Sequence, residues 1–586
     1  MTVEKLITDH IDIWSSALQT RSAAGRGSNG KIDLYGIKKL RELILELAVR
    51  GKLVPQDPND EPASELLKRI AAEKAELVKQ GKIKKQKPLP EISEDEKPFE
   101  LPVGWEWTTL SEIATINPKI EVTDDEQDIS FVPMPCISTR FDGAHDQEIK
   151  SWGKVKKGYT HFVDGDIAIA KITPCFENSK AVIFKGLKGG VGVGTTELHV
   201  ARPISSELNL QYILLNIKSP HYLSMGESMM TGSAGQKRVP RNFFENYPLP
   251  FPPIAEQIRI VETFSQLMTI CDQLEQQSLS SLDAHQQLVK TLLATLTDSQ
   301  NAEELAENWA RISQYFDTLF TNEASIDALK QTILQLAVMG KLVPQDPNDE
   351  PASELLKRIE QEKAQLVKEG KIKKQKPLPP VSDEEKPFEL PVGWGWARLG
   401  DIGTISGGGT PSKNNEEYWL GDIPWLSPKD MKVDYISTAE FNISELAVAN
   451  SSVRIIPNNS ILFVVRGMIL AHTFPVAINK KEVTINQDMK SITSHLFNMD
   501  FLLNLMKGMS RNVLSLVDRS SHGTCKLVSE KLFNLQIPLP PLSEQSRINN
   551  RIEELVSLCD TLKSRLQSAQ QTQLHLADAL TDAALN

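Results

Sequence analysis

A long duplicated segment constrains the fold of this chain more than any other feature of its sequence. Residues 47–70 recur at residues 336–359 with one change, Arg50 to Met339. Two further blocks, G-K-I-K-K-Q-K-P-L-P and E-K-P-F-E-L-P-V-G-W, recur downstream at the same spacing. A repeat of this length and order is typical of a chain that folds as two copies of one structural unit.

The segments enclosed by the repeated blocks have nearly the same length but share little sequence. A second pair of blocks, P-P-I-A-E-Q-I-R-I ending at Ile260 and P-P-L-S-E-Q-S-R-I ending at Ile548, closes each copy. The enclosed inserts are residues 108–245 and 397–533. We infer that the shared frame holds the architecture and binds the same partner twice, whereas each insert binds something different.

Composition and charge exclude several classes of protein. The 586 residues, of which 40% are hydrophobic and 24% charged, are typical of a globular chain with more than one domain. No segment approaches the ~18 consecutive apolar residues of a membrane span. Glu4, Asp9 and Asp12 lie where a secretory signal would be apolar. The five cysteines form no C-x-x-C motif, which argues against disulfides and a zinc site and favours a reducing cytoplasm.

Heptad patterns predict a long helix at the end of each copy. Proline runs at 248–253 and 538–541 precede them, so each helix begins abruptly. We expect the two helices to pack on each other as an antiparallel coiled coil. A helix of about thirty residues is about 45 Å long, and such a spacer would set the two inserts apart by roughly the length of one helical turn of B-DNA. The expected seam positions are Ile260, Phe264, Leu267, Cys271, Leu274, Leu288 and Leu292 in the first helix, and Ile548, Ile552, Leu555, Cys559, Leu562, Leu566, Ala569, Gln573, Leu576 and Leu580 in the second.

The seam of the first helix becomes polar at Ser278, Ser281 and His285. A contact with a partner subunit and a poorly packed turn both explain this stretch. Residues 1–50 resemble residues 295–339. The start of the chain therefore continues the pattern at which its end stops, so that the repeat is circularly closed.

The inserts have the pattern of small α/β bodies with irregular loops. Strand-like runs lie at 161–172 and 181–185 in the first insert and at 456–466 and 475–478 in the second. Each insert then continues into a loop of small and basic residues, T-G-S-A-G-Q-K-R in the first and R-S-S-H-G-T-C-K in the second.

These two loops are the main candidates for DNA contact. Short side chains let backbone N–H groups approach phosphate, and nearby Lys, Arg, Gln and His reach phosphates or base edges. The net charge of −11 argues against nucleic-acid binding when taken alone, and a solvated surface loop is the alternative explanation for any single lysine. Recurrence at the same place in both inserts favours the functional interpretation. The candidate DNA-binding residues are Lys154, Lys156, Lys157, Lys171, Gly232, Ser233, Gly235, Gln236, Lys237, Arg238, Arg241, Arg466, Arg519, Ser520, Ser521, His522 and Lys526.

Motifs that resemble catalytic or cofactor sites fail on inspection. Glycine-rich residues 189–195 and 407–410 lack the Lys-Ser/Thr of a phosphate loop and open no helix. Asp164 and Asp166 lack the further carboxylate of a nuclease cluster, so a strand end is the better interpretation. The Asn-Pro at 117–118 lacks the second proline and the aromatic residue of an amino-methyltransferase. We expect no catalytic centre and no metal site.

Paired tryptophans recur in both copies, as G-W-E-W at 104–107 and G-W-G-W at 393–396. Tryptophans stack on bases in some nucleic-acid-binding proteins. Because the same pair stands in both copies, a role in the core or in an interface is favoured over contact with two different DNA sequences.

These patterns predict a multi-domain α/β (α+β) chain. Two small globular recognition domains are separated by long antiparallel coiled-coil helices, in a pseudo-twofold circular repeat. The expected segments are an N-terminal helical segment at 1–50, a helical and proline-rich linker at 51–107, the first recognition domain at 108–250, a central helical spacer at 251–340, the repeated linker at 341–396, the second recognition domain at 397–540 and the C-terminal spacer helix at 541–586.

The duplicated frame with divergent inserts resembles the specificity subunit of a type I restriction–modification system. Each insert is opened by L-P-x-G-W-x-W-x-x-L, at Leu101–Leu110 and Leu390–Leu399, and is closed by a P-L-P-type block with E-Q before a long helix. The resemblance covers essentially the whole chain. The repeated A-V-x-G-K-L-V-P-Q-D-P block is similar to that of the larger members of this family.

The resemblance implies that each insert is a target recognition domain for one half of a gapped, bipartite DNA site. The site is asymmetric because the inserts differ. Two modification subunits, which use S-adenosylmethionine to methylate adenine, and two restriction subunits, which use ATP and Mg, would be the partners on double-stranded DNA. The chain itself would hold neither a cofactor nor a catalytic residue. Its expected location is the bacterial or archaeal cytoplasm, without membrane association.

Two alternatives remain at this point. One is a single-chain methyltransferase or nuclease with disguised motifs, which methyl transfer by the purified chain would establish. The other is a non-catalytic, two-headed scaffold for two different proteins, which the acidic net charge suits. Failure to bind any duplex, even with modification subunits present, would favour that scaffold.

Overall fold

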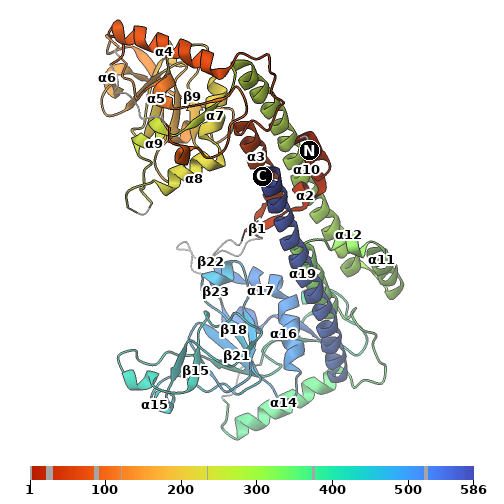
Figure 1. The fold of residues 1–586 in the computed structure, drawn as a ribbon. Coiled ribbons are helices and arrows are strands. Elements are labelled where there is room, and N and C mark those ends of the chain that lie inside the picture. The colour runs from red at the N-terminus through yellow and green to blue at the C-terminus, as the bar shows by residue number, and fades with distance from the viewer. Residues whose placement is uncertain are drawn as a thin grey trace. The chain divides into compact units, whose positions relative to one another are not determined.

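A computed structural model describes residues 3–21, 31–84, 92–120, 122–233, 235–372, 377–519 and 525–585. The chain forms two compact units, and each unit gathers segments from distant parts of the sequence. Unit 1 comprises Met1–Gln19, Asp33–Leu279 and Gln570–Asn586, whereas unit 2 comprises Thr20–Ile32 and Ser280–Ala569. Each unit has a sheet-rich body and a share of long helices (Figure 1).

The first helices of unit 1 pack closely on one another. They are α1 (Val3–Thr8), α2 (Ile11–Ser16) and α3 (Tyr35–Val49). The apolar residues of α3 recur at helical spacing, which buries Ile37, Leu40 and Ile44. Gly36 permits the contact with α2, because a Cβ atom there would lie 2.3 Å from the Trp14 carbonyl oxygen. Short strands β1 (Gln19–Arg21) and β2 (Lys31–Asp33) lie between α2 and α3 in the chain.

The repeated S-E-L-L-K-R-I segment forms the same helix in both units. These helices are α4 (Ala63–Lys79) and α14 (Ala352–Lys368). Each follows a proline, which suits a helix start. Each buries the same three positions, Ala63, Leu66 and Ile70 in α4 and Ala352, Leu355 and Ile359 in α14.

The insert of unit 1 contains two four-stranded sheets. The first has the order β6-β5-β10-β7 and the second β4-β11-β8-β9. The strands are β4 (Ala114–Ile116), β5 (Asp128–Val132), β6 (Glu148–Ser151), β7 (Thr160–Val163), β8 (Ile167–Ala170), β9 (Ala181–Ile183), β10 (Val191–Gly194) and β11 (Leu198–Pro203). Strand β3 (Glu106–Thr108) pairs with β12 (Leu249–Phe251) at the two ends of the insert.

The insert of unit 2 has a five-stranded sheet, β14-β21-β18-β19-β16, and a three-stranded sheet, β17-β15-β20. The strands are β14 (Thr404–Gly407), β15 (Ile423–Leu426), β16 (Tyr435–Ile436), β17 (Phe441–Ile443), β18 (Ile461–Val464), β19 (Val476–Asn479), β20 (Thr484–Ile485) and β21 (Met489–Thr493). Strand β13 (Gly395–Arg398) pairs with β24 (Gln536–Leu539), and β22 (Val517–Arg519) pairs with β23 (Cys525–Leu527).

The two inserts share one topology although their sequences differ. The antiparallel order β4-β11-β8-β9 in unit 1 corresponds to β14-β21-β18-β19 in unit 2. In the other sheet, β5 pairs parallel with β10 and antiparallel with β6, as β15 does with β20 and β17. The turn into the central strand is also shared, because Gly165 (φ 88°) and Asn459 (φ 58°) occupy its left-handed position. That turn divides the strand-like run expected at 161–172 into β7 and β8.

Two long helices contribute to both units. Helix α10 (Ile254–Asp298) belongs to unit 1 up to Leu279 and to unit 2 beyond it. Helix α19 (Leu542–Leu585) belongs to unit 2 up to Ala569 and to unit 1 beyond it. In unit 2 both helices share a core with α13 (Glu323–Val338), which contacts α19 in antiparallel sense, since Glu323 and Asp327 pair with Lys563 while Lys330 pairs with Asp560.

The expected heptad seam holds in the first half of each long helix and shifts in the second half. Ile260, Phe264 and Cys271 are buried in α10, and Ile548, Ile552 and Cys559 are buried in α19. Leu288, by contrast, is 50% exposed and Leu576 is 41% exposed. The buried positions there are Val289, Leu293 and Leu296 in α10 and Ala577 in α19. The register prediction was therefore wrong beyond the polar stretch, since 3.6 residues per turn drift against a strict heptad.

The polar end of that stretch contacts the chain itself. The ring of His285 forms hydrogen bonds with the Thr318 carbonyl oxygen (3.2 Å) and with the Asn322 amide group (3.4 Å). These partners lie at the end of α12 (Phe316–Leu319) and at the N-cap of α13. The polar seam at His285 is thus satisfied by a neighbouring turn within unit 2.

The repeated frame is held by the same side-chain contacts in each unit. In unit 1 the Trp105 indole donates to Glu256 (3.0 Å), Gln56 donates to the same carboxylate (3.1 Å), and Arg259 pairs with Asp60 (2.6 Å). In unit 2 the corresponding contacts join Trp394 and Gln345 to Glu544 and Arg547 to Asp349. The prediction that the repeated tryptophans are structural is confirmed for Trp105 and Trp394.

Shorter helices complete both units. They are α5 (Leu110–Ile113), α6 (Trp152–Val155), α7 (Leu210–Ile217), α8 (Pro220–Ser228), α9 (Arg241–Asn246), α11 (Ala302–Gln314), α15 (Glu445–Asn450), α16 (Met499–Gly508), α17 (Ser510–Ser515) and α18 (Ser529–Phe533). Short 3₁₀ turns lie at Glu94–Glu96, Met134–Cys136, Lys188–Gly190, Asp383–Glu385, Glu416–Trp419 and Met468–Ala471.

Candidate nucleic-acid interface

In unit 1 the small-residue loop between α8 and α9 folds as a hairpin onto the end of strand β8. We call the described residues of this loop, 231–233 and 235–238, hairpin 1. Thr231 and Arg238 exchange backbone hydrogen bonds of 2.8 and 3.1 Å, which close it. The Val239 N–H donates to the Lys171 carbonyl oxygen (2.8 Å), one residue beyond the end of β8. Hairpin 1 is therefore attached to the strand end that carries Lys171.

The small residues of hairpin 1 are required by its turn. Gly232 (φ 125°) and Gly235 (φ 76°) have left-handed backbone conformations. A Cβ atom on Gly232 would lie 2.8 Å from the Gln236 carbonyl oxygen. The side chains of Ser233, Gln236 and Lys237 are exposed. The turn therefore presents polar side chains on a tightly folded backbone.

Two arginines near hairpin 1 are engaged by carboxylates. Arg238 donates from Nε and Nη2 to the two carboxylate oxygens of Glu197, both at 2.9 Å. These hydrogen bonds lower the pKa of Glu197, so its carboxylate stays ionised. Arg241 pairs with Glu245 one helical turn later, at 2.5 Å.

Unit 2 has a hairpin at the corresponding strand end. We call the paired strands β22 and β23 hairpin 2. The backbones of Lys526 and Arg466, which lies just beyond β18, form an isolated antiparallel β-bridge. The Leu527 N–H also donates to the Val465 carbonyl oxygen (2.9 Å). The exposed Arg519 donates to the Ala471 carbonyl oxygen (3.3 Å). Three candidate residues of this loop, Ser520, Ser521 and His522, lie outside the described residues.

The structure thus unites candidates that were identified separately. Lys171 meets hairpin 1, and Arg466 meets hairpin 2, at the ends of the corresponding strands β8 and β18. The hairpins differ in sequence and stand on one shared topology. Such an arrangement suits two domains that bind different ligands of one chemical class.

Comparison with known proteins identifies the family. The sequence model described as "Type I restriction modification DNA specificity domain" matches residues 102–284 and 391–571. The chain belongs to the family of type I restriction–modification specificity subunits. It is 71% identical to the type I restriction enzyme EcoEI specificity subunit of Escherichia coli and 64% identical to the EcoAI specificity subunit, in each case over 100% of both chains. The HsdS subunit of Thermoanaerobacter tengcongensis aligns over 84% of this chain and 98% of its own, with 17% identity and a TM-score of 0.42.

Specificity subunits supply DNA sequence specificity and are non-catalytic parts of type I restriction–modification complexes. Membership in the family therefore decides between the alternatives left open by the sequence. The disguised methyltransferase or nuclease and the scaffold for unrelated proteins both give way to a DNA-specificity subunit.

A second group of candidates in this specificity subunit lies apart from hairpin 1. Lys154 is in α6, and Lys156 and Lys157 follow it, next to the sheet that contains β6. Lys156 pairs with Asp125 at 2.7 Å, whereas Lys154 and Lys157 are exposed. Within unit 1, α6 and the loop between α8 and α9 lie at opposite ends of the body (Figure 1). The structure does not bring the lysines and the hairpin together.

Two carboxylates next to the hairpins were missed by the sequence analysis. Glu197 directly precedes β11, and Asp488 directly precedes β21. The backbone carbonyl oxygen of Glu197 accepts the Lys171 N–H (2.9 Å), and that of Asp488 accepts the Val465 N–H (2.8 Å). No shared motif surrounds them, so only the position immediately before a strand offered a sequence signal.

His199 and Thr173 place polar atoms beneath hairpin 1. Burial lowers the pKa of His199 to about 4, which keeps its ring neutral near pH 7. One ring nitrogen, Nε2, lies 3.1 Å from the Val239 carbonyl oxygen and donates to it. Among the described residues, His199 Nδ1 and Thr173 Oγ1 are buried and have no hydrogen-bond partner.

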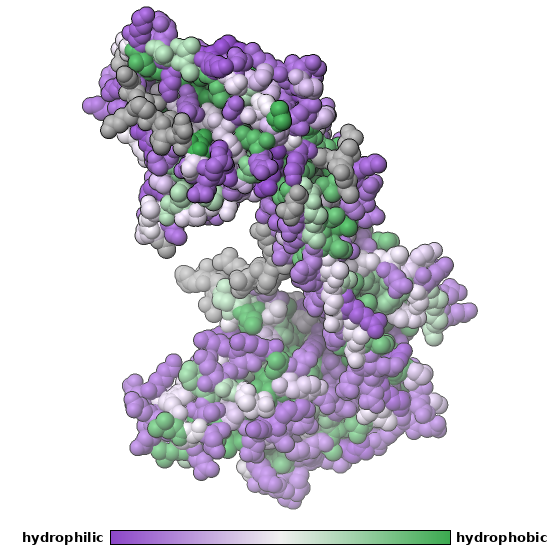
Figure 2. All heavy atoms as spheres, viewed as in Figure 1, coloured by the Kyte–Doolittle hydropathy of each residue, from purple (hydrophilic) through white to green (hydrophobic). Residues whose placement is uncertain are grey.

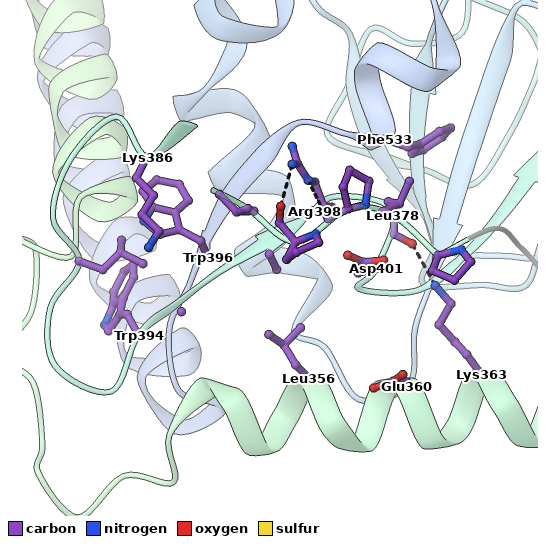
Figure 3. Close-up of a pocket in the computed structure, with 18 of the residues that line it drawn as sticks. Leu356, Glu360, Lys363, Leu378, Lys386, Trp394, Trp396, Arg398, Asp401 and Phe533 are labelled. Carbon is purple, nitrogen blue, oxygen red and sulfur yellow. Dashed lines mark hydrogen bonds between the residues drawn. The ribbon is translucent and has the colours of Figure 1, made fainter. Parts of the chain in front are cut away.

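A large pocket in unit 2 belongs to the repeated frame. It has a volume of about 1370 Å³ and lies between α14 and β13. Figure 3 shows Glu360 and Lys363 of α14 along one side and Trp396 and Arg398 of β13 along the other. Many of its lining residues recur in unit 1; for example, Lys363 corresponds to Lys74 and Trp396 to Trp107. Other lining residues differ, since Ala71 and Thr109 stand in unit 1 where Glu360 and Arg398 stand in unit 2.

The residues that resembled catalytic motifs have structural roles. Asp166 is buried and accepts two hydrogen bonds from Arg202, at 2.9 and 2.8 Å. Gly192 and Gly194 lie inside β10, where added Cβ atoms would meet Phe162 and Val132 at 2.5 and 2.7 Å. Among the residues that the structure covers, no group of three or more His, Cys, Asp or Glu side chains is arranged to hold a metal ion.

The visible surface of both sheet-rich bodies is mostly hydrophilic (Figure 2). In the part of the chain that the structure describes, no helix combines the length and the apolar character needed to cross a bilayer.

Proposed function

We propose that this specificity subunit recognises one asymmetric, gapped DNA site, and that residues 108–250 and 397–540 each bind one half-site. Hairpins 1 and 2, with Lys171 and Arg466 at the adjoining strand ends, are the proposed contacts to bases and phosphates. The observation that carries this proposal is the shared topology of the two inserts, which place unlike hairpins at the same strand end. Two recognition domains of different sequence on one frame are expected to bind half-sites of different base sequence.

The repeated frame is the proposed docking surface for two modification subunits. Its contacts around Glu256 and Glu544 are the same in both units, so one partner protein finds two similar surfaces. The modification subunits would bind S-adenosylmethionine and methylate one adenine in each half-site. Two restriction subunits would add ATP- and Mg-dependent translocation and cleavage, in the bacterial or archaeal cytoplasm.

Partner subunits also account for the acidic chain. The net charge is −11, and several candidate cations, such as Arg238 and Lys156, are already paired with carboxylates. Affinity for phosphate depends on the number of free cations at the interface. We infer that the modification subunits supply much of the non-specific affinity for DNA, whereas the hairpins supply the preference for particular bases.

The proposal is tested by mapping methylated adenines across a host genome by single-molecule sequencing. The chain is expressed with its modification subunits, and a strain without the chain is the control. We expect paired adenines on opposite strands within one asymmetric, gapped motif, and their loss in the control. Unchanged methylation in the control would remove the proposed function.

A further inference from the structure

We propose that Glu197 in unit 1 and Asp488 in unit 2 are positioning residues that hold each recognition hairpin in the conformation that selects its half-site. The inference rests on the proposed function of the hairpins. It concerns an acid–arginine contact that recurs in both inserts although the repeat does not encode it.

In unit 1 one residue holds both parts of the site. The backbone carbonyl oxygen of Glu197 accepts the Lys171 N–H at 2.9 Å, which holds the end of strand β8. Its carboxylate accepts two hydrogen bonds from Arg238, the residue that closes hairpin 1. A bidentate arginine–carboxylate pair fixes orientation as well as distance.

Arg238 is also bonded to the hairpin from within. Its Nη1 donates to the Gln236 carbonyl oxygen at 3.2 Å, while Nε and Nη2 bind Glu197. All three side-chain nitrogens of Arg238 thus make a hydrogen bond within the insert. We therefore reassign Arg238 from direct DNA contact to positioning, and leave Gln236 and Lys237 as the contacting side chains of hairpin 1.

Unit 2 has a similar arrangement, but its arginine, Arg466, lies at the end of strand β18 and not in the hairpin. The carbonyl oxygen of Asp488 accepts the N–H groups of Val465 (2.8 Å) and Arg466 (3.3 Å) at the end of strand β18. Its carboxylate lies 3.7 Å from the Arg466 guanidinium group. The backbone of Arg466 in turn forms an antiparallel β-bridge with Lys526 of hairpin 2.

The two acids correspond in topology but not in sequence. Each directly precedes the strand that pairs with the hairpin-bearing strand, β11 beside β8 and β21 beside β18. Their surroundings, T-T-E-L at 195–198 and N-Q-D-M at 486–489, share no motif. Two unlike sequences thus place a carboxylate at one point, which is expected if the hairpin base needs it.

The contact in unit 1 is the tighter of the two. Glu197 and Arg238 form two hydrogen bonds of 2.9 Å, whereas Asp488 and Arg466 form a single longer ion pair. Removing the charge of Glu197 should therefore affect its half-site more than the same change at Asp488. In unit 2, Arg466 is 49% exposed at its side chain and stays available for DNA.

The test uses the full chain assembled with its modification subunits and DNA duplexes that carry the mapped site. Each duplex has one base changed in one half-site, and discrimination is the methylation rate on the correct site divided by that on the changed site. We expect Glu197→Gln to lower discrimination about tenfold in one half-site and to leave the other unchanged, because a single mismatch typically costs that factor or more. Asp488→Asn should lower discrimination in the opposite half-site by a smaller factor.

A charge exchange separates positioning from mere stability. The double variant Glu197→Arg with Arg238→Glu restores the pair in reverse and should recover most of the lost discrimination, which a simple loss of folding would not. Glu207→Gln is the matched control. Glu207 forms an ion pair with Arg69 (2.9 Å), and neither residue belongs to hairpin 1. It should leave discrimination at both half-sites unchanged.

Two outcomes would overturn the inference. One is unchanged discrimination in Glu197→Gln when Gln236→Ala does alter it, which leaves the proposed function intact and removes only the positioning role. The other is an equal loss at both half-sites without recovery in the double variant. If Gln236→Ala and Lys237→Ala also change neither half-site, the proposed function of hairpin 1 fails instead.

Discussion

Single residues hold the repeated frame through contacts that are the same in both units. Glu256 and Glu544 each stand in the first turn of a long helix and each accept a tryptophan indole and a glutamine amide. Burial raises the pKa of both carboxyls, whereas the hydrogen bonds from the glutamine and the tryptophan lower it and so favour the ionised form. The repeat thus provides a matched pair of sites for experiment.

Loss of the indole donor should destabilise both units to a similar extent. Trp105→Phe and Trp394→Phe each leave a buried carboxylate oxygen without its donor, at an expected cost of about 1–3 kcal/mol. Chemical denaturation of the two variants should show this loss, and Trp309→Phe, at a 39% exposed side chain, should not. A loss in only one variant would contradict the structural equivalence of the two sites.

His199 should make unit 1 sensitive to acid. Burial lowers its pKa to about 4 in the folded chain, whereas the unfolded chain keeps about 6.5. The unfolded state therefore binds more protons between these values, and the stability contributed by neutral His199 is lost as the pH falls through this window.

From pH 7 to pH 5 the free energy of unfolding should fall about 2 kcal/mol more in the natural chain than in His199→Gln. Denaturant titrations at the two pH values measure this difference. His495→Gln, at an exposed histidine, is the control and should behave like the natural chain. Parallel pH profiles for the natural chain and His199→Gln would contradict the prediction.

At the scale of elements, two features can be tested: which face of each long helix is buried, and how each hairpin is attached to its strand end. The buried stripe of α10 moves from the expected Leu288 and Leu292 to Val289 and Leu293 after the polar stretch. The hairpins, in contrast, depend on strand ends that the rest of the sheet positions.

The helix register is tested by two neighbouring leucines. Leu293 is 4% exposed and part of the unit 2 core, so Leu293→Ala should cost about 2–4 kcal/mol. Leu288 is 50% exposed, so Leu288→Ala should cost well under ~1 kcal/mol. Denaturant unfolding of the two variants compares them directly, and the reverse order of losses would restore the heptad register.

Hairpin 1 should contribute one phosphate contact through Lys237. Lys237→Ala in the assembled complex should weaken DNA binding and reduce the slope of log K against log salt by about 1. Lys157→Ala is the comparison, because Lys157 is exposed on the lysine group far from hairpin 1. An unchanged slope for Lys237→Ala, measured from 50 to 200 mM salt, would remove this contact.

At the scale of the whole molecule, two inserts of one topology stand in one duplicated frame. The strands at the two ends of each insert pair with each other, β3 with β12 in unit 1 and β13 with β24 in unit 2. These couples provide equivalent junctions. The inserts are therefore expected to be exchangeable between the two positions.

Duplication of one insert at these junctions should make the two half-sites alike. A chain in which residues 399–535 are replaced by residues 109–248 should methylate a site made of one half-site and its inverted copy, because a pseudo-twofold repeat presents the second insert in inverted sense. Genome-wide mapping of methylated adenines gives the result. The motif of the natural chain, with methylation retained, would show that the inserts do not carry specificity.

Much of this protein was determined by sequence alone, for a definite physical reason. Near-identical segments must fold alike, so the duplicated frame, the buried tryptophans and the existence of two long helices followed from the repeat. The family resemblance rested on the same blocks. Small-residue loops at one place in both inserts likewise identified the hairpins as candidates.

Only the tertiary structure decided what lies within the inserts and which side chains meet there. One topology tolerates many sequences, because burial of alternate strand residues requires apolar character rather than particular residues. The contact joins Glu197, which precedes β11, to Arg238 of hairpin 1, two residues far apart in the chain whose pairing no local pattern records. The shift of the helix seam past His285 was likewise visible only in the packed helices, which keep 3.6 residues per turn instead of following a strict heptad.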